Sequence, residues 1–203
     1  MTTSARDGLA EVIYFPGVAA PVDAVAVLTE TVPERGPAAS TRAENVAMHA
    51  LTRRGQSRRE LETILRSREL DPDTIEAELE RLTGVGLIDD AALAEQIIRT
   101  ARERKKLGRT AIIAELKRRK LDSDTIDAAL TELDGDSDNE RERELHQAVA
   151  LAEQRAGRLS ALDRDTAVRR LSGFLQRKGY SGDIVRQAVS HALDGRTSTV
   201  RFR

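Results

Sequence analysis

Two stretches of the chain, Leu70-Asp-Pro-Asp-Thr-Ile75 and Leu121-Asp-Ser-Asp-Thr-Ile126, decide the fold. They lie 51 residues apart, and five of their six residues are identical. The same offset superposes four further apolar positions, namely Leu61 with Ile112, Leu65 with Leu116, Leu79 with Leu130 and Leu82 with Leu133. Two unrelated amphipathic helices can share a period, but they seldom share a cap and a turn as well. The pattern therefore predicts an internal repeat.

The helices inside the repeat are marked by their start and stop signals. Ser57-Arg-Arg-Glu60 is a capping box, in which the hydroxyl and the carboxylate each satisfy an amide of the first turn. Asp71-Pro72 starts the next helix, because Asp caps an N-terminus well and Pro suits the first helical position. Gly84 and Gly86 end that helix. The paired acids Asp89-Asp90 start another helix.

A third, weaker copy follows at an offset of 59 residues, which places Leu171 on Ile112, Leu175 on Leu116, Tyr180 on Leu121 and Val185 on Ile126. Each copy is preceded by a further predicted helix, at about 42–54, 90–105 and 140–157. We therefore expect an all-α fold of tandem three-helix repeats forming an elongated, curved helical array. The repeats span 41–88, 89–134 and 135–195, with an acidic hinge at 134–139 leading into the last, and 196–203 is a short tail.

The first 40 residues differ in composition from the rest of the chain. They hold four of the five prolines, carry two basic and five acidic side chains, and show no sustained helical period. We expect a flexible arm over residues 1–40. The alternative is a short strand at Val12-Ile13-Tyr14-Phe15.

Composition argues against several functional classes. The chain has no Cys and only 2% aromatic residues, which excludes disulfides and a large aromatic-lined cofactor pocket. The three His residues fall in different repeats, and there is no Gly-rich phosphate loop and no G-x-S-x-G elbow. We expect no enzyme activity, no cofactor, no metal and no small-molecule substrate. Without an apolar run of roughly 20 residues, we also expect no membrane association and a cytoplasmic location.

Basic clusters are the candidate functional feature. Between residues 102 and 120 there are nine basic residues against two acids, and residues 145–203 carry eleven basic against five acidic side chains. A single basic pair at a helix end only complements the helix dipole, but the middle cluster is dense enough to attract phosphates or an acidic protein face. The candidate partner-binding or nucleic-acid-binding residues are Arg102, Arg104, Lys105, Lys106, Arg109, Lys117, Arg118, Arg119, Lys120, Arg169, Arg170, Arg177 and Lys178. We expect both runs of the middle cluster to project from one edge of the second repeat.

Several motifs resemble those of one protein family, the RecX regulatory proteins. Gly84-Val-Gly-Leu-Ile-Asp-Asp90 with Leu93-Ala94 is similar to the join between the family's first and second repeats, and Ser57-Arg-Arg-Glu-Leu61 also fits. Gly108-Arg109 with Ile112 and Leu116 resembles the opening of the second repeat. Gly173-Phe-Leu-Gln-Arg-Lys-Gly-Tyr180 resembles the third-repeat signature and is the most specific match. The resemblance covers about Ala43 to Leu193. One departure is Arg119-Lys120, where the family often has Lys-Gly.

The resemblance implies a modulator of the RecA recombinase, mostly inhibitory. Proteins of this family bind along the groove or at the growing end of the RecA filament on single-stranded DNA, and thereby limit strand exchange and the damage response. The expected partner is thus the RecA filament, with single- or double-stranded DNA as a further partner through backbone contacts. The alternative is a helix-turn-helix transcription regulator, because 57–82 has the turn and cap spacing of that motif. A metal-dependent nuclease ranks third.

Overall fold

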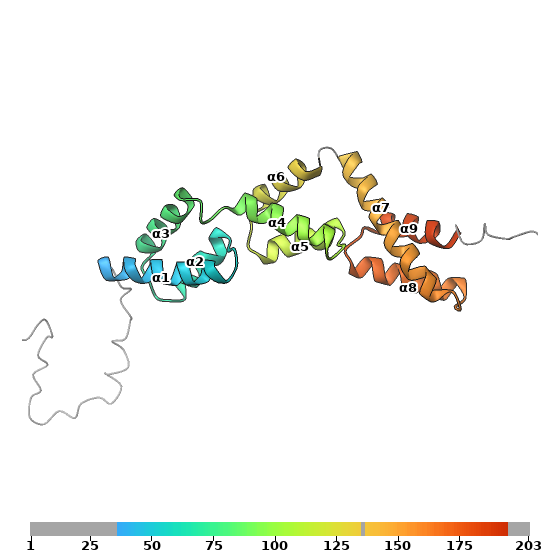
Figure 1. The fold of residues 1–203 in the computed structure, drawn as a ribbon, viewed down its shortest axis with the longest axis horizontal. Coiled ribbons are helices and arrows are strands. Elements are labelled where there is room, and N and C mark those ends of the chain that lie inside the picture. The colour runs from blue at the N-terminus through green and yellow to red at the C-terminus, as the bar shows by residue number, and fades with distance from the viewer. Residues whose placement is uncertain (1–35, 135–136, 195–203) are drawn as a thin grey trace, which may run out of the picture. The chain divides into compact units, whose positions relative to one another are not determined.

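The computed structural model describes residues 36–134 and 137–194, and this part of the chain is built from α-helices joined by short turns (Figure 1). The helices are α1 (Pro37–Arg53), α2 (Arg58–Arg66), α3 (Pro72–Gly84), α4 (Asp90–Glu103), α5 (Arg109–Arg118), α6 (Ser123–Asp134), α7 (Ser137–Ala156), α8 (Arg164–Arg177) and α9 (Gly182–Asp194), with a single 3-10 turn at Gly157–Leu159. No strand occurs in these described ranges. The predicted all-α class is confirmed.

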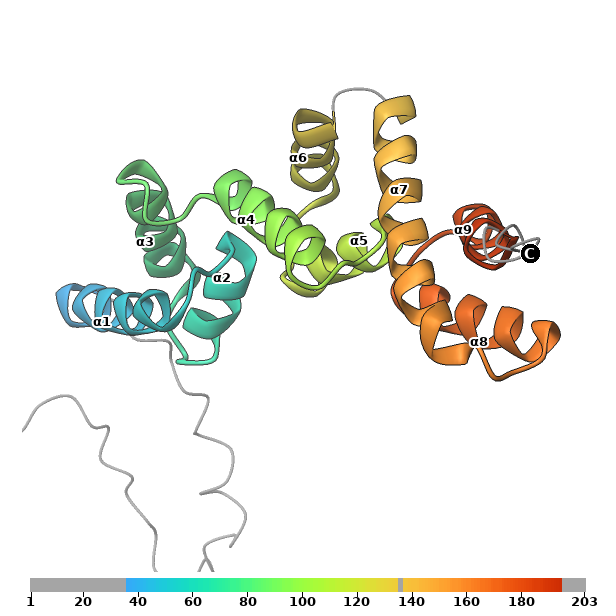
Figure 2. The same cartoon turned by 45° about the vertical axis from the view of Figure 1, so that its right-hand side comes forward.

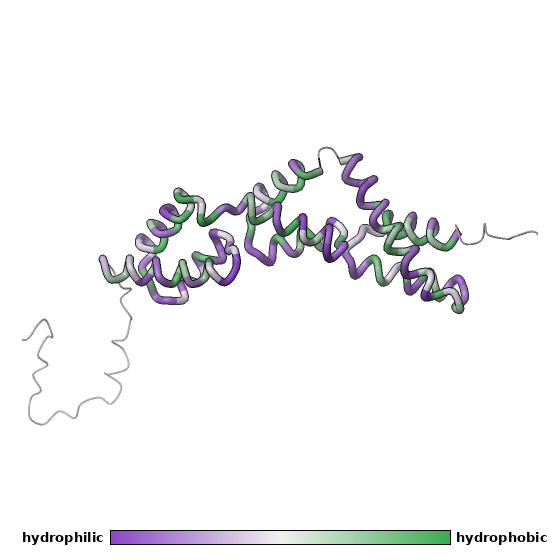
Figure 3. Tube along the Cα trace, in the orientation of Figure 1, coloured by the Kyte–Doolittle hydropathy of each residue, from purple (hydrophilic) through white to green (hydrophobic). Residues whose placement is uncertain are grey.

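The helices group in threes, and each group has its own apolar core. The first module comprises α1–α3, the second α4–α6 and the third α7–α9, and the buried apolar residues form three separate clusters that follow this division. The positions superposed by the sequence offsets are equivalent in the cores, for example Leu61, Ile112 and Leu171, which are each at most 2% exposed. Apolar and polar residues alternate along the helices (Figure 3). The tandem three-helix repeat is therefore confirmed.

The helix starts follow from the caps that the sequence contains. The Ser57 hydroxyl accepts from the Glu60 amide while the Glu60 carboxylate accepts from the Ser57 amide, which is the expected capping box. Asp71 accepts from the Thr74 amide, and Asp122 does the same for Thr125 at the matching position of the second module. These caps fix where α2, α3 and α6 begin, whereas α5 begins after Gly108 without a side-chain cap.

The turn between the second and third helices has the same conformation in all three modules. Glu69, Lys120 and Gly179 occupy equivalent positions and have φ angles of 60°, 56° and 86°. This left-handed region suits glycine and disfavours other residues. Lys120, the departure from the family pattern, therefore leaves the turn unchanged.

Two boundaries differ from the sequence-based expectation. Helix α1 begins at Pro37 rather than near residue 42, because Gly36 and Pro37 supply a start and Pro stands at the first helical position. The expected acidic loop is shorter than predicted: Asp134 ends α6 and α7 already begins at Ser137. Asp138 and Glu140 lie in the first turn of α7, where the helix dipole favours acids. The expected arm falls largely on residues 1–35, outside the described residues, as does the alternative strand.

Candidate partner-binding surface and module junctions

The predicted basic cluster lies at the ends of two helices of the second module. Arg102 is in the last turn of α4, whereas Lys117 and Arg118 are in the last turn of α5, as the sequence suggested. Arg109 opens α5 at its other end. Because the two ends of α5 contact different modules, the expectation of one common edge is wrong for Arg109, Arg119 and Lys120.

At the first junction, Arg119 binds the first module. Its guanidinium contacts the Glu60 carboxylate, with Nε 2.9 Å from Oε1, and donates to the carbonyl of Gly55. The side chains of Arg119 and Glu60 are only 17% and 11% exposed. The Ser57 hydroxyl donates to the Arg119 carbonyl at 2.6 Å, and Lys120 Nζ donates to the Thr63 hydroxyl at 2.7 Å. Arg119 and Lys120 therefore hold two modules together.

Glu60 is the electrostatic centre of this junction. Its burial alone would raise the pKa of the carboxyl group, but hydrogen bonds from Arg119, from the Ser57 amide and from Arg54 outweigh that effect, together with the charge of Arg119. The net result is a lowered pKa, so Glu60 is ionised at neutral pH. One carboxylate thus completes the cap of α2 and anchors the next module.

At the second junction, the turn between α8 and α9 meets the first turn of α5. The Gly108 amide donates to the carbonyl of Lys178 at 2.9 Å, and the Thr110 amide donates to that of Gly179 at 3.2 Å. A Cβ on Gly179 would lie 2.3 Å from the Cβ of Ala111, and one on Gly108 would lie 2.6 Å from the Gly179 carbonyl oxygen. Only glycine fits at both positions. Lys178 Nζ donates to the Lys105 carbonyl at 2.6 Å.

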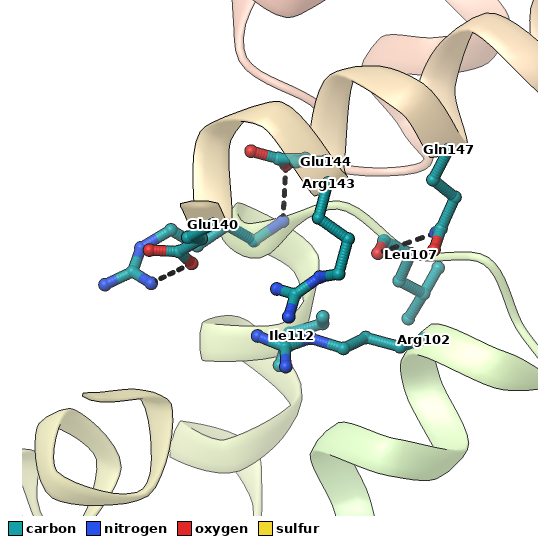
Figure 4. A pocket seen from close by; sticks show the side chains of 8 residues that line it. Arg102, Leu107, Ile112, Glu140, Arg143, Glu144 and Gln147 are labelled. Atoms are coloured by element: carbon teal, nitrogen blue, oxygen red, sulfur yellow. Dashed lines mark hydrogen bonds and ion pairs between the residues drawn. The ribbon is translucent and has the colours of Figure 1, made fainter. Parts of the chain in front are cut away.

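Helix α7 completes the second junction by reaching the N-terminus of α5 (Figures 2 and 4). Glu144 accepts from the Arg109 amide at 2.8 Å, and the Arg109 guanidinium pairs with Glu140. Farther along α7, Gln147 donates to the Tyr180 hydroxyl at 2.7 Å. Burial raises the pKa of Tyr180 to about 12, so the phenol stays protonated. Arg109 and Lys178 are thus parts of a junction.

The two junctions share one type of hydrogen bond. In each, the first backbone amide of a module's second helix donates to a carboxylate on the first helix of the next module: Arg58 to Asp90 at 2.9 Å, and Arg109 to Glu144. These amides lack partners inside their own helix, and the helix dipole favours an acid there. Burial and the charges of Asp122 and Asp89 raise the pKa of Asp90 in spite of the Arg58 amide.

Several of the predicted basic residues take no part in the junctions and face outward. Arg104, Lys106, Lys117 and Arg118 are exposed on the second module, with Arg118 3.7 Å from Glu115. Lys105 lies 2.5 Å from the same carboxylate. Arg102 and Arg143 point toward each other above Ile112 between α4 and α7 (Figure 4). On the third module Arg169, Arg170 and Arg177 are exposed.

Sequence reasoning missed several functional positions. It assigned Glu60 and Asp90 only to helix starts and did not single out Glu144, so it missed their role at the junctions. The repeat offset places Arg119 and Lys178 at equivalent turn positions and could have marked them as structural. Sequence reasoning also missed Arg155 of α7, which lines a hollow with Arg169, Arg170 and Arg177. Within residues 36–134 and 137–194, no group of three or more metal-binding side chains occurs. None of the helices in the same ranges is long and apolar enough to cross a membrane.

Comparison with known protein families gives three consecutive matches. The models described as the first, second and third three-helix domains of RecX match residues 43–82, 89–130 and 142–189. Each match falls within one module.

Individual proteins agree with these matches. The regulatory protein RecX of Amycolatopsis mediterranei is 34% identical over 152 residues, 75% of this chain and 83% of its own length. That of Streptomyces coelicolor is 35% identical over 162 residues, 80% of this chain and 82% of its own length. The crystal structure of RecX from Lactobacillus salivarius is similar in fold, with a TM-score of 0.66 and 24% identity over 76% of this chain and 97% of that one.

Proposed function

Because this chain belongs to the RecX family of regulatory proteins, we propose that it binds RecA filaments on single-stranded DNA and restrains recombination. The observation that supports this most directly is the ordered match of all three family domains, one to each module. The relatives are named regulatory proteins. The proposed role is therefore that of a binding protein without catalysis, working in the cytoplasm and limiting strand exchange and the damage response.

The proposed contact surface is the set of exposed cations on the second module. Lys117 and Arg118 lie at the end of α5, while Arg104 and Lys106 lie just beyond α4. The junctions already use the side chains of Arg109, Arg119 and Lys120. A partner is therefore expected to contact the remaining cations. An acidic face on the recombinase would complement them.

Three linked modules suit a partner that is itself repetitive. A contact made by one module raises the effective concentration of the others near neighbouring subunits. Individually weak, screened charge contacts can then add up to useful affinity. This explains why the proposed surface needs no deep pocket.

The proposal is tested by co-sedimentation with RecA on single-stranded DNA, together with a strand-exchange assay. We expect the chain to sediment with the filament and to slow exchange below one copy per RecA. Lys117→Glu combined with Arg118→Glu should weaken inhibition about tenfold or more, because like charges facing each other across an interface are costly. The matched control reverses the exposed Arg53 and Arg68 of the first module, which changes the net charge equally.

Two results would count against the proposal. Absence of co-sedimentation at low salt would remove the recombinase as partner. Unchanged inhibition by the Lys117/Arg118 variant, or an equal loss in the control, would remove the second-module surface from the mechanism.

A further inference from the structure

A group of four arginines in the third module surrounds one hollow. Arg169, Arg170 and Arg177 come from α8 and Arg155 comes from α7, and the hollow of about 400 Å³ is otherwise lined by Leu159 and Gly173. On α8 the residues follow a helical spacing, since 170, 173 and 177 fall on one face. The four cations are therefore gathered by the packing of two helices.

These arginines differ from most others in the described residues because no carboxylate pairs with them. Many arginines elsewhere in the described residues pair with a carboxylate, as Arg119 does with Glu60, Arg164 with Asp194 and Arg186 with Asp183. In the described part of the chain, none of the four around the hollow makes an ion pair within 4.0 Å. Arg169 acts on an acid at longer range, since the pKa of Asp163 is lowered mainly by hydrogen bonds from Thr166 and to a lesser degree by the charge of Arg169. The hollow thus concentrates positive charge.

The shape of the hollow depends on a missing side chain. Gly173 is one of the residues that line it, and a Cβ at this position would lie 3.3 Å from Nη1 of Arg177. Arg155 is held from the other side, with its guanidinium carbon 4.4 Å from the centre of the Phe174 ring. The Arg155 guanidinium is therefore positioned by packing, which lowers the entropy cost of binding an anion.

We infer that this hollow binds the sugar–phosphate backbone of a nucleic acid. Planar guanidinium groups match phosphate oxygens in pairs and are the preferred phosphate ligands of proteins. An amphipathic acidic peptide would need an apolar floor, whereas Leu159 is the one aliphatic side chain lining the hollow. No aromatic ring lines this hollow, and Arg155 lies over the neighbouring Phe174 ring. Binding is thus independent of base sequence.

This inference does not depend on the proposed function, because it concerns the chain by itself. The probe is a fluorescent single-stranded oligothymidine, titrated with the full chain at several salt concentrations and without recombinase. Four phosphate contacts predict a slope of log K against log salt of about −2.8, at about 0.7 per contact. Each contact then raises the binding constant about fivefold at 0.1 M salt relative to 1 M salt.

The test uses two variants and one control. Arg169→Gln with Arg177→Gln should weaken binding about 25-fold at 0.1 M salt and flatten the slope by about 1.4. Gly173→Leu fills the hollow without changing the net charge, and it should weaken binding while α8 stays folded, because Leu favours a helix more than Gly does. The control Arg53→Gln with Arg68→Gln removes the same charge from the first module and should change binding less than about threefold.

Three outcomes would overturn the inference. These outcomes are no binding by the unaltered chain at 50 mM salt, an equal loss in the control, or full binding by Gly173→Leu. Because recombinase is absent from the assay, failure here leaves the co-sedimentation result intact, and the two proposals fail separately.

Discussion

Replacing Gly179 by Ala should open the junction between the second and third modules. The added Cβ would lie 2.3 Å from the Cβ of Ala111 and 2.4 Å from its backbone nitrogen, far inside the usual contact distance of about 3.5–4.0 Å. The turn must therefore withdraw from α5, which breaks the hydrogen bonds of the Gly108 and Thr110 amides. Two such bonds contribute about 1–3 kcal/mol, and the left-handed φ of 86° adds about 1–2 kcal/mol for a residue with a Cβ.

The expected loss in the free energy of unfolding is about 2–5 kcal/mol, and it is measured in two ways. Urea unfolding gives the total change in stability, while hydrogen exchange should show the Gly108 and Thr110 amides losing protection at least about 30-fold. Glu69→Ala is the matched control, because Glu69 has the same turn conformation without a preceding module packed on it in the described residues. It should stay within about 0.5 kcal/mol. Full protection of both amides in the Gly179 variant would refute this reasoning.

Three further substitutions probe the first junction and the caps. Glu60→Gln should lower the free energy of unfolding by about 1–3 kcal/mol at pH 7. Because folding lowers the pKa of Glu60, the parent is the more stable protein above pH ~4.3, and this difference disappears as the pH falls through the folded pKa. The free energies of unfolding of the two proteins, measured against pH, should therefore converge in acid. Asp90→Asn should be at least as stable as the parent at pH 7, because folding raises the pKa of Asp90 and the amide oxygen can still accept from Arg58; marked destabilisation in thermal melts would contradict this. Asp71→Ala should cost about 1 kcal/mol through the lost cap and Asp71→Asn much less, so equal melting temperatures for the two would exclude a capping role.

Much of the fold could be predicted from sequence because its determinants are local. A cap such as Asp71 or Asp122 acts within four residues, and the apolar spacing of Leu61 and Leu65 identifies the buried face of a helix whatever lies opposite. The repeat offset added long-range information, because it linked equivalent positions in different modules. Even the missed start of α1 had a local signal in Gly36-Pro37.

The role of the basic residues could not be predicted in the same way. Arg118 and Arg119 are neighbours with the same chemistry, yet Arg118 is exposed and Arg119 is largely buried against Glu60. The difference arises from how one module docks on another, and no local pattern encodes that register. Likewise, Arg155 joins the arginines of α8 only through the packing of α7 on α8.

The second helix of the third module begins differently from those of the first two modules. The offset of 59 places Ala167 on Gly108, but α8 begins at Arg164 and therefore carries an additional turn before this position. The Ala167 amide donates to the Asp163 carbonyl within the helix, and Asp163 caps the new first turn by accepting from the Thr166 amide. The position equivalent to Arg109 is Val168, which therefore lies inside α8 and not at its first residue.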